Sequence, residues 1–253
     1  MCIDYDHAKN PQTPDGPLAA IPVFFAGAKP QSLLDVGCGH GAWLGAAHRF
    51  GVLDVVGVDG LVVPDEQLLI SPNLYREIFK QHDLTQPLKL GRRFDAVLCL
   101  EVAEHLDEKC APVLIDSLVA HSDRVVFSAA CPGQPGQHHV NCQWPSYWQK
   151  LFNERGYVCT DEIRSRIWND ERIGPWYRQN VFAARRDSGH AGREPRISSI
   201  LHPDVCSGIV EGAVTSEFPK IMNKIEQGRL PFRWYVRCFF KAAWRKFLRR
   251  FCK

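Results

Sequence analysis

The chain has 253 residues, 45% of them hydrophobic, which is enough to bury one sizeable core and leave an appendage. Its ten cysteines are scattered without C-x-x-C spacing, which argues against a disulfide framework or a structural zinc site and favours a reducing compartment. The first 30 residues lack a basic start before an apolar stretch, and no uncharged apolar run reaches the ~20 residues of a membrane span, so we expect a cytoplasmic protein.

The net charge of +3 conceals an asymmetry between the end of the chain and the rest. Residues 229–253 carry nine Lys and Arg and no Asp or Glu, whereas the remaining chain holds 22 basic and 28 acidic residues. We therefore expect an acidic body and a cationic tail with different roles.

Strand and helix signals alternate through the first half of the chain, after a polar arm and a short helix in residues 1–30. The expected strands are residues 32–36, 54–59, 94–100 and 124–130, with one more short strand before residues 82–84. Helical segments, such as 41–50 and 108–121, separate these runs. The alternation predicts an α/β, Rossmann-like doubly wound sheet that is mostly parallel.

The second half departs from this pattern. A Gly/Pro-rich loop follows Ala130, residues 146–157 predict a helix, and residues 158–168 and 178–185 predict two final strands, paired as a hairpin. We therefore expect one domain over residues 31–186, a linker and weakly structured segment over 187–228, and a basic amphipathic helix over 229–253.

The stretch LLDVGCGHGAWL places three glycines directly after the first strand, at Gly37, Gly39 and Gly41. A glycine turn between strand and helix lets a ligand approach the backbone at the carboxyl edge of the sheet. Asp59 ends the next strand, where a carboxylate can accept two ribose hydroxyls, and Asp83 follows the third, where an adenine amino group can be read. The alternative is that glycines and strand-end acids only make turns, which applies most strongly to Asp83.

These motifs, together with FDAVLCLEVAEHL, resemble the four motifs of class I S-adenosylmethionine-dependent methyltransferases, in order, within residues 30–185. The resemblance implies a seven-stranded sheet with an antiparallel last strand and S-adenosyl-L-methionine as the methyl donor. It also implies cofactor contacts from the following residues: Asp35, Gly37, Cys38, Gly39, Asp59, Asp83, Leu84 and the backbone near Leu100.

The segments EVAEH and HHVN follow the fourth and fifth strands and should lie over the transferred methyl group. Three interpretations stay open. A histidine is the general base for a hydroxyl, with His139 first and His105 second, alongside Glu101 in the catalytic set. Alternatively, Glu101, Glu104, His105 and His139 hold a divalent metal, since E-x-x-E-H with a later histidine resembles the metal-binding pattern of small-RNA 2′-O-methyltransferases. In the third, these residues only cap a helix and orient the loop.

The acceptor is suggested by the segment from Gly136 to Tyr157, which resembles methyltransferases of bacterial surface-glycan and secondary-metabolite pathways. Several aromatic residues offer a platform for a sugar ring or flat acceptor, although packing in the core and against helices is the preferred explanation for most of them. They are Trp144, Tyr147, Trp148, Trp168, Trp176 and Tyr177.

The tail carries basic residues every fourth position from Arg233, with aromatic residues between them. This pattern is typical of a helix lying on an anionic membrane surface, and it places the protein peripherally on the inner face of the membrane. Packing against a partner and RNA binding are the alternatives, and the acidic body disfavours a broad nucleic-acid footprint.

We therefore expect O-methylation of a sugar hydroxyl on a small-molecule or lipid-linked glycan precursor. The rival hypotheses are methylation of a quinone-like or other lipophilic small molecule, RNA 2′-O-methylation, and a non-catalytic S-adenosylmethionine-binding scaffold at a membrane. The sequence does not indicate the oligomeric state.

Overall fold

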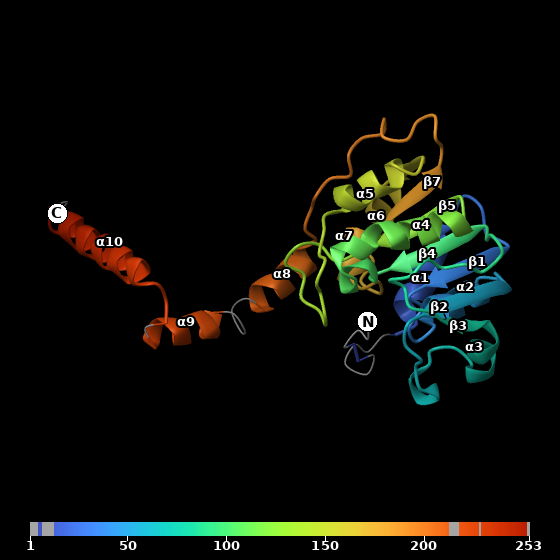
Figure 1. Ribbon diagram of the computed structural model, residues 1–253, viewed down its shortest axis with the longest axis horizontal. Coiled ribbons are helices and arrows are strands. Elements are labelled where there is room, and N and C mark those ends of the chain that lie inside the picture. The colour runs from blue at the N-terminus through green and yellow to red at the C-terminus, as the bar shows by residue number, and fades with distance from the viewer. Residues whose placement is uncertain (1–4, 7–12, 213–217, 228, 252–253) are drawn as a thin grey trace. The chain divides into compact units, whose positions relative to one another are not determined.

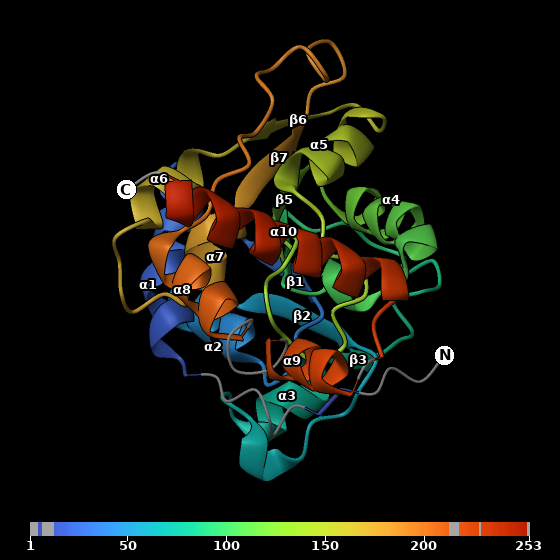
Figure 2. The ribbon, with the colours of Figure 1, turned by 90° about the vertical axis from the view of Figure 1, so that its left-hand side faces the viewer.

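The computed structural model describes residues 5–6, 13–212, 218–227 and 229–251, with side chains described as far as Lys241 in the last of these ranges. A seven-stranded sheet of order β3-β2-β1-β4-β5-β7-β6 forms its centre (Figures 1 and 2). The strands are β1 (Ser32–Val36), β2 (Asp54–Asp59), β3 (Phe79–Gln81), β4 (Ala96–Leu100), β5 (Arg124–Ser128), β6 (Tyr157–Thr160) and β7 (Phe182–Arg186).

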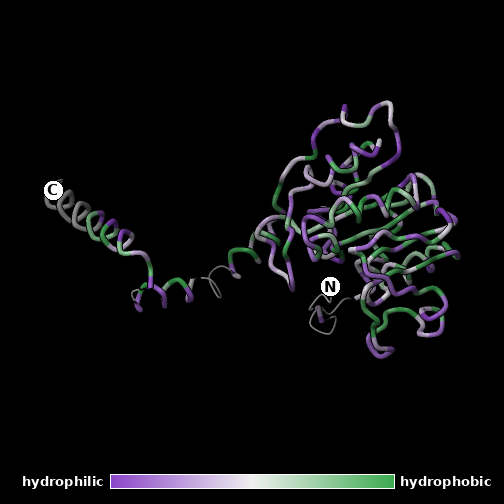
Figure 3. The backbone as a smooth tube through the Cα atoms, in the orientation of Figure 1, coloured by the Kyte–Doolittle hydropathy of each residue, from purple (hydrophilic) through white to green (hydrophobic). Residues whose placement is uncertain are grey.

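The first five strands are parallel, whereas β7 runs antiparallel between β5 and β6. β4 is apolar throughout and β5 at its three middle residues, as expected for parallel strands whose two faces are both covered, and hydrophobic segments run through the sheet (Figure 3). The mostly parallel sheet with antiparallel final strands confirms the predicted fold class. Since parallel strands end at one edge, the turns after β1, β2, β3 and β4 converge there.

Helices cover the two faces unequally. α1 (Asp15–Phe24), α2 (Ala42–Arg49), α6 (Glu162–Ile167) and α7 (Pro175–Asn180) contribute to one hydrophobic cluster, and α4 (Ala111–His121) and α5 (Pro145–Asn153) contribute to the other. α3 (Pro72–Ile78) adds Tyr75 to the first cluster. The short 3₁₀ turns η2 (Asp65–Gln67), η3 (Ala103–His105) and η4 (Glu108–Cys110) complete the connections.

The two final strands do not form the simple hairpin predicted from residues 158–168 and 178–185. β6 ends at Thr160, and α6 and α7 intervene before β7 begins at Phe182. Ile163 and Ile167 are buried one helical turn apart, so the second half of the predicted strand forms a short helix instead.

The segment after β7 is tied to the sheet domain as far as Cys206, which ends the first compact unit. The carboxylate of Glu194 accepts hydrogen bonds from the side chains of Gln149 and Asn153 and from the amide of Cys159. Ile197 is also buried. Residues 194–206 are therefore held by specific contacts, within a region that the sequence predicted as linker and weak structure.

The second compact unit begins at Ser207. It contains the end of α8 (Pro203–Gly212), then α9 (Phe218–Glu226) and α10 (Phe232–Phe251), which agrees with the helix predicted for the tail. Within the described residues, no helix is both long and apolar enough to cross a bilayer.

Candidate active site

The glycine turn after β1 is folded against the end of β2. The amides of Gly37 and Cys38 donate to the carbonyl of Val58, at 2.7 and 3.1 Å. Gly37 has φ +84° and Gly39 has φ +45°, conformations that favour glycine. A Cβ at Gly37 would also collide with the side chain of Val102. The turn therefore requires glycine for its backbone and for its packing.

Asp59 connects this turn to the following loop. Its Oδ2 accepts a 2.9 Å hydrogen bond from the Gly39 amide, and its Oδ1 accepts one of 2.9 Å from Leu61. Each carboxylate oxygen keeps a second lone pair, and the residue is only partly buried, so ribose hydroxyls can still bind there. Tyr75 supports the same turn by donating from its hydroxyl to the Gly39 carbonyl at 3.0 Å, a contact for which the sequence offers no signal.

Asp35 lies at the carboxyl end of β1 and is 1% exposed. Its Oδ2 makes no hydrogen bond of ordinary geometry to a described residue. Burial, followed by the charge of Asp59, raises the pKa of Asp35 from 3.8 to about 8. A buried carboxyl group without a partner fits a cationic ligand group, such as the ammonium of the methionine part of S-adenosylmethionine.

The raised pKa of Asp35 makes a prediction for the ligand-free protein. In the folded state the group stays protonated until about pH 8, whereas the unfolded group ionises near pH 4, so its contribution to stability is full below pH 4 and lost between pH 4 and 8. Asp35→Asn removes this loss. The quantity to measure is the melting temperature of Asp35→Asn minus the melting temperature of wild type. We expect this difference to be larger at pH 8 than at pH 4, by about 4 °C or more. A constant difference would contradict the raised pKa.

The other predicted cofactor residues lie at the same edge of the sheet. Cys38 is buried in the turn, and Leu100 is buried at the end of β4. Asp83 is exposed after β3, and its Oδ1 accepts hydrogen bonds from the amide and hydroxyl of Thr85. These bonds hold the pKa of Asp83 below its usual value. Leu84 packs against the core beside it.

Glu101 follows β4 in a left-handed conformation, with φ +55°. Such a backbone costs about 1–3 kcal/mol and persists where the surroundings enforce it. The Glu101 amide donates to the carbonyl and hydroxyl of Ser128 on β5. The carboxylate accepts from the side-chain amides of Gln134 and Asn180, at 2.9 and 3.2 Å. Burial raises the pKa of Glu101.

Glu104, His105 and His139 form a cluster in which one ligand atom from each residue lies within 4.8 Å of the others. Glu104 is completely buried, and its two carboxylate oxygens make no hydrogen bond of ordinary geometry to a described residue. Burial and the charge of Glu101 raise the pKa of Glu104 well above its usual value. Burial, followed by the charge of His139, lowers the pKa of His105 to about 4. The sequence predicted a set of four metal ligands that included Glu101, whereas the cluster in the structure contains only the other three residues.

The loop between β5 and α5 brings His139 to this cluster. Its backbone is fixed to η3 because the amides of Val140 and Asn141 both donate to the Glu104 carbonyl. His139 Nδ1 lies 3.0 Å from the carbonyl of Gln134. A carbonyl only accepts, so Nδ1 carries the proton and Nε2 keeps its lone pair.

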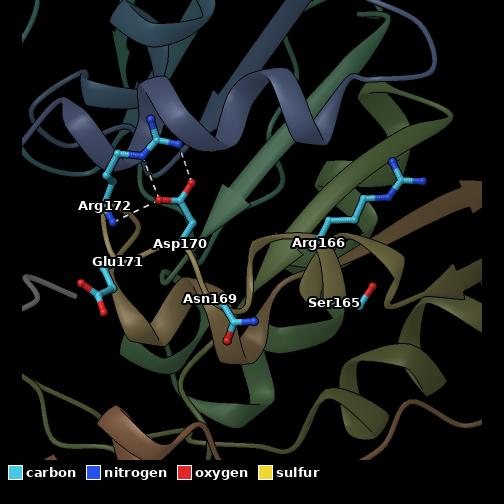
Figure 4. A pocket seen from close by; sticks show the side chains of 6 residues that line it. All are labelled: Ser165, Arg166, Asn169, Asp170, Glu171 and Arg172. Atoms are coloured by element: carbon cyan, nitrogen blue, oxygen red, sulfur yellow. Dashed lines mark hydrogen bonds and ion pairs between the residues drawn. The ribbon is translucent and has the colours of Figure 1, made fainter.

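The aromatic residues proposed as an acceptor platform differ in burial, and Trp144, Tyr147 and Trp168 are half-buried. Trp148 and Tyr177 are 1% and 8% exposed and belong to the core, while Trp176 is 40% exposed. A polar surface pocket lies elsewhere, on and after α6 (Figure 4), and none of the predicted site residues lines it. Asp170 and Arg172 are paired with each other there.

Comparison with known proteins identifies the family to which this chain belongs. Residues 12–150 match the model of a family described as a methyltransferase domain. The chain belongs to this methyltransferase family. With the glycine turn and acidic strand ends of the class I fold in place, it is an S-adenosylmethionine-dependent methyltransferase.

Solved structures of methyltransferases share the fold. A magnesium protoporphyrin IX methyltransferase from Synechocystis PCC 6803 with bound SAH is 21% identical, with a TM-score of 0.50 over 71% of this chain and 84% of that one. The methyltransferase domain of bacterial CtHen1-C is 19% identical, with a TM-score of 0.51 over 68% and 98%. At this identity the likeness concerns the fold alone. A comparison with curated proteins found no match.

Proposed function

We propose that this methyltransferase transfers the methyl group to a hydroxyl oxygen. The observation that carries the proposal is the Glu104, His105 and His139 cluster beyond the ends of β4 and β5. The predicted cofactor residues end the neighbouring strands β1 to β4 at the same edge of the sheet. A hydroxyl acceptor must lose a proton during methyl transfer, and this cluster holds the groups suited to remove it.

In this proposal His139 is the general base. S-adenosylmethionine supplies a methyl group made electrophilic by the sulfonium. His139 accepts the hydroxyl proton at Nε2, because its Nδ1 hydrogen bonds to the Gln134 carbonyl. His105 is neutral at physiological pH because burial lowers its pKa, so it places no positive charge beside the His139 ring. Gln134 links Glu101 to His139, because its side-chain amide donates to Glu101 Oε2 and its carbonyl accepts from His139 Nδ1.

A specific observation also favours a second candidate, metal-assisted O-methylation. Both Glu104 oxygens and His105 Nδ1 are buried without a hydrogen bond of ordinary geometry to a described residue, and mixed carboxylate and imidazole donors suit Mn, Fe or Zn. A divalent ion held by Glu104, His105 and His139 would lower the pKa of the acceptor hydroxyl. The test measures the melting temperature with and without added Mn²⁺, in wild type and in Glu104→Gln. Stabilisation of wild type alone supports this candidate, and no shift in either protein removes it.

The acceptor that we propose is a sugar hydroxyl on a lipid-linked precursor, presented at the inner face of an anionic membrane. α10 supports this choice. Phe232, Phe239 and Phe240 are 81%, 68% and 65% exposed. At about 100° per residue, their positions fall on one side of the helix. Arg233 and Arg237 are exposed on the same helix, which suits interfacial binding to anionic lipid.

Substitutions in α10 test the membrane part of the proposal. We expect Phe239→Ser with Phe240→Ser to lower co-sedimentation with vesicles that contain phosphatidylglycerol, because two apolar contacts with the bilayer are lost. Leu53→Ser is the matched control, since Leu53 is also strongly exposed but lies in the sheet domain. Equal binding by the double variant and wild type would show that α10 is not the anchor.

A panel of acceptors tests the hydroxyl chemistry. Octyl glucoside represents a sugar on a lipid, and para-nitrophenol represents a lipophilic phenol. A uridine oligonucleotide represents RNA. Each is incubated with the protein and S-adenosylmethionine that carries a radiolabelled methyl group. Labelling of octyl glucoside supports the proposed acceptor class. Labelling of the phenol or the oligonucleotide alone would replace it with the corresponding rival, and labelling of none would contradict O-methylation of these classes.

A further inference from the structure

A short piece of the N-terminal arm, Tyr5 and Asp6, lies against the loop that carries His139. The amide of Asp6 donates to Gln137 Oε1 at 3.2 Å, and Gln137 Nε2 donates back to the Asp6 carbonyl at 3.0 Å. The two residues are 131 positions apart in sequence. Such a reciprocal pair imitates the pairing between two backbone amides and therefore fixes the orientation of the arm residue as well as its distance.

This pairing sets Tyr5 beside His105. The ring of Tyr5 meets that of His105 edge to face, with centroids 4.9 Å apart and planes at 66°. His105 in turn meets His139, with centroids 5.1 Å apart. Three rings thus form a continuous row from the arm to the proposed base. Neither the composition nor the motifs of the arm predict this placement.

We propose that Tyr5 is a specificity-determining residue that forms one wall of the acceptor site. This inference rests on the proposed function, because the acceptor must approach His139. A tyrosine ring offers an apolar face to the C–H groups of a pyranose and a hydroxyl at its edge, so the acceptor class that it suits is a sugar ring. Gln137 is the residue that positions this wall.

The first experiment tests, without any catalysis, whether Tyr5 covers His105. Diethyl pyrocarbonate modifies accessible histidines, and peptide mass spectrometry reads each site. We expect Tyr5→Ala to raise the modification rate of His105 severalfold, whereas Tyr5→Phe stays close to wild type. His190, whose side chain is 73% exposed, is the internal control. An unchanged modification rate of His105 in Tyr5→Ala would contradict the proposal that Tyr5 forms a wall of the acceptor site.

The second experiment tests the sugar. With S-adenosylhomocysteine present, octyl glucoside should slow the modification of His105 and His139 in wild type and in Tyr5→Phe. In Tyr5→Ala we expect about tenfold more octyl glucoside to be needed for the same protection, as loss of one aromatic contact implies. Equal protection in all three proteins, or protection in none, would overturn the specificity role. Since no methyl group is transferred, this result is separate from a failure of the labelling panel, which bears on the proposed function.

Discussion

His139→Ala is expected to lower the rate of methyl transfer to octyl glucoside by about a hundredfold or more, because general-base catalysis contributes 10²–10⁴ to such reactions. The affinity for S-adenosylhomocysteine should stay within about twofold of wild type, since the cofactor residues lie on other strand ends. Initial rates at saturating donor, together with calorimetric titration of S-adenosylhomocysteine, measure the two effects separately.

The adjacent histidine supplies a matched control for this prediction. His138 is exposed and has φ +49°, so His138→Asn removes an imidazole while keeping a residue that tolerates the left-handed conformation. This variant should retain the wild-type rate. Full activity of His139→Ala would remove His139 both as the base and as a metal ligand.

Asp59→Ala should weaken the binding of S-adenosylmethionine by about a hundredfold, which corresponds to two charge-assisted hydrogen bonds from the ribose hydroxyls. The structure adds a second reason. Asp59 also accepts from the amides of Gly39 and Leu61, so its removal loosens the glycine turn that forms the binding surface. Isothermal titration calorimetry measures the change.

A surface acid provides the comparison for Asp59. Asp65 pairs with Arg76 on an exposed part of the chain, so Asp65→Ala removes one carboxylate of the same type without touching the turn. Its S-adenosylmethionine affinity should equal that of wild type. If Asp59→Ala bound S-adenosylmethionine as tightly as Asp65→Ala does, the assignment of Asp59 to the ribose would be wrong.

The fold and the cofactor edge were predictable because both depend on local patterns. Apolar runs such as residues 32–36 and 124–130 specify buried parallel strands, and the glycine turn follows the first of them directly. The order of the strands along the chain is then enough to predict that the acidic residues at the strand ends lie beside that turn. In the structure Asp59 contacts Gly39, 20 residues away in the sequence, at the strand end where the sequence placed it.

The remaining features depend on contacts between distant segments, which a single sequence does not show. Tyr75 supports Gly39 from α3, while Gln134 in the loop after β5 and Asn180 in α7 hold Glu101. Tyr5 reaches His105 from the arm. Short amphipathic segments are a second cause of error, because the isoleucines of α6 fit a strand pattern as well as one helical turn.

The central claim is that the glycine turn binds S-adenosylmethionine. Calorimetric titration of the purified protein with S-adenosylmethionine, S-adenosylhomocysteine and NAD, a ligand of other Rossmann-like sheets, tests it most directly. We predict micromolar binding of the two sulfur compounds and no binding of NAD, both before and after treatment with a chelator. Absence of binding by both sulfur compounds would contradict the claim that the glycine turn, Asp35 and Asp59 form a working methyl-donor site.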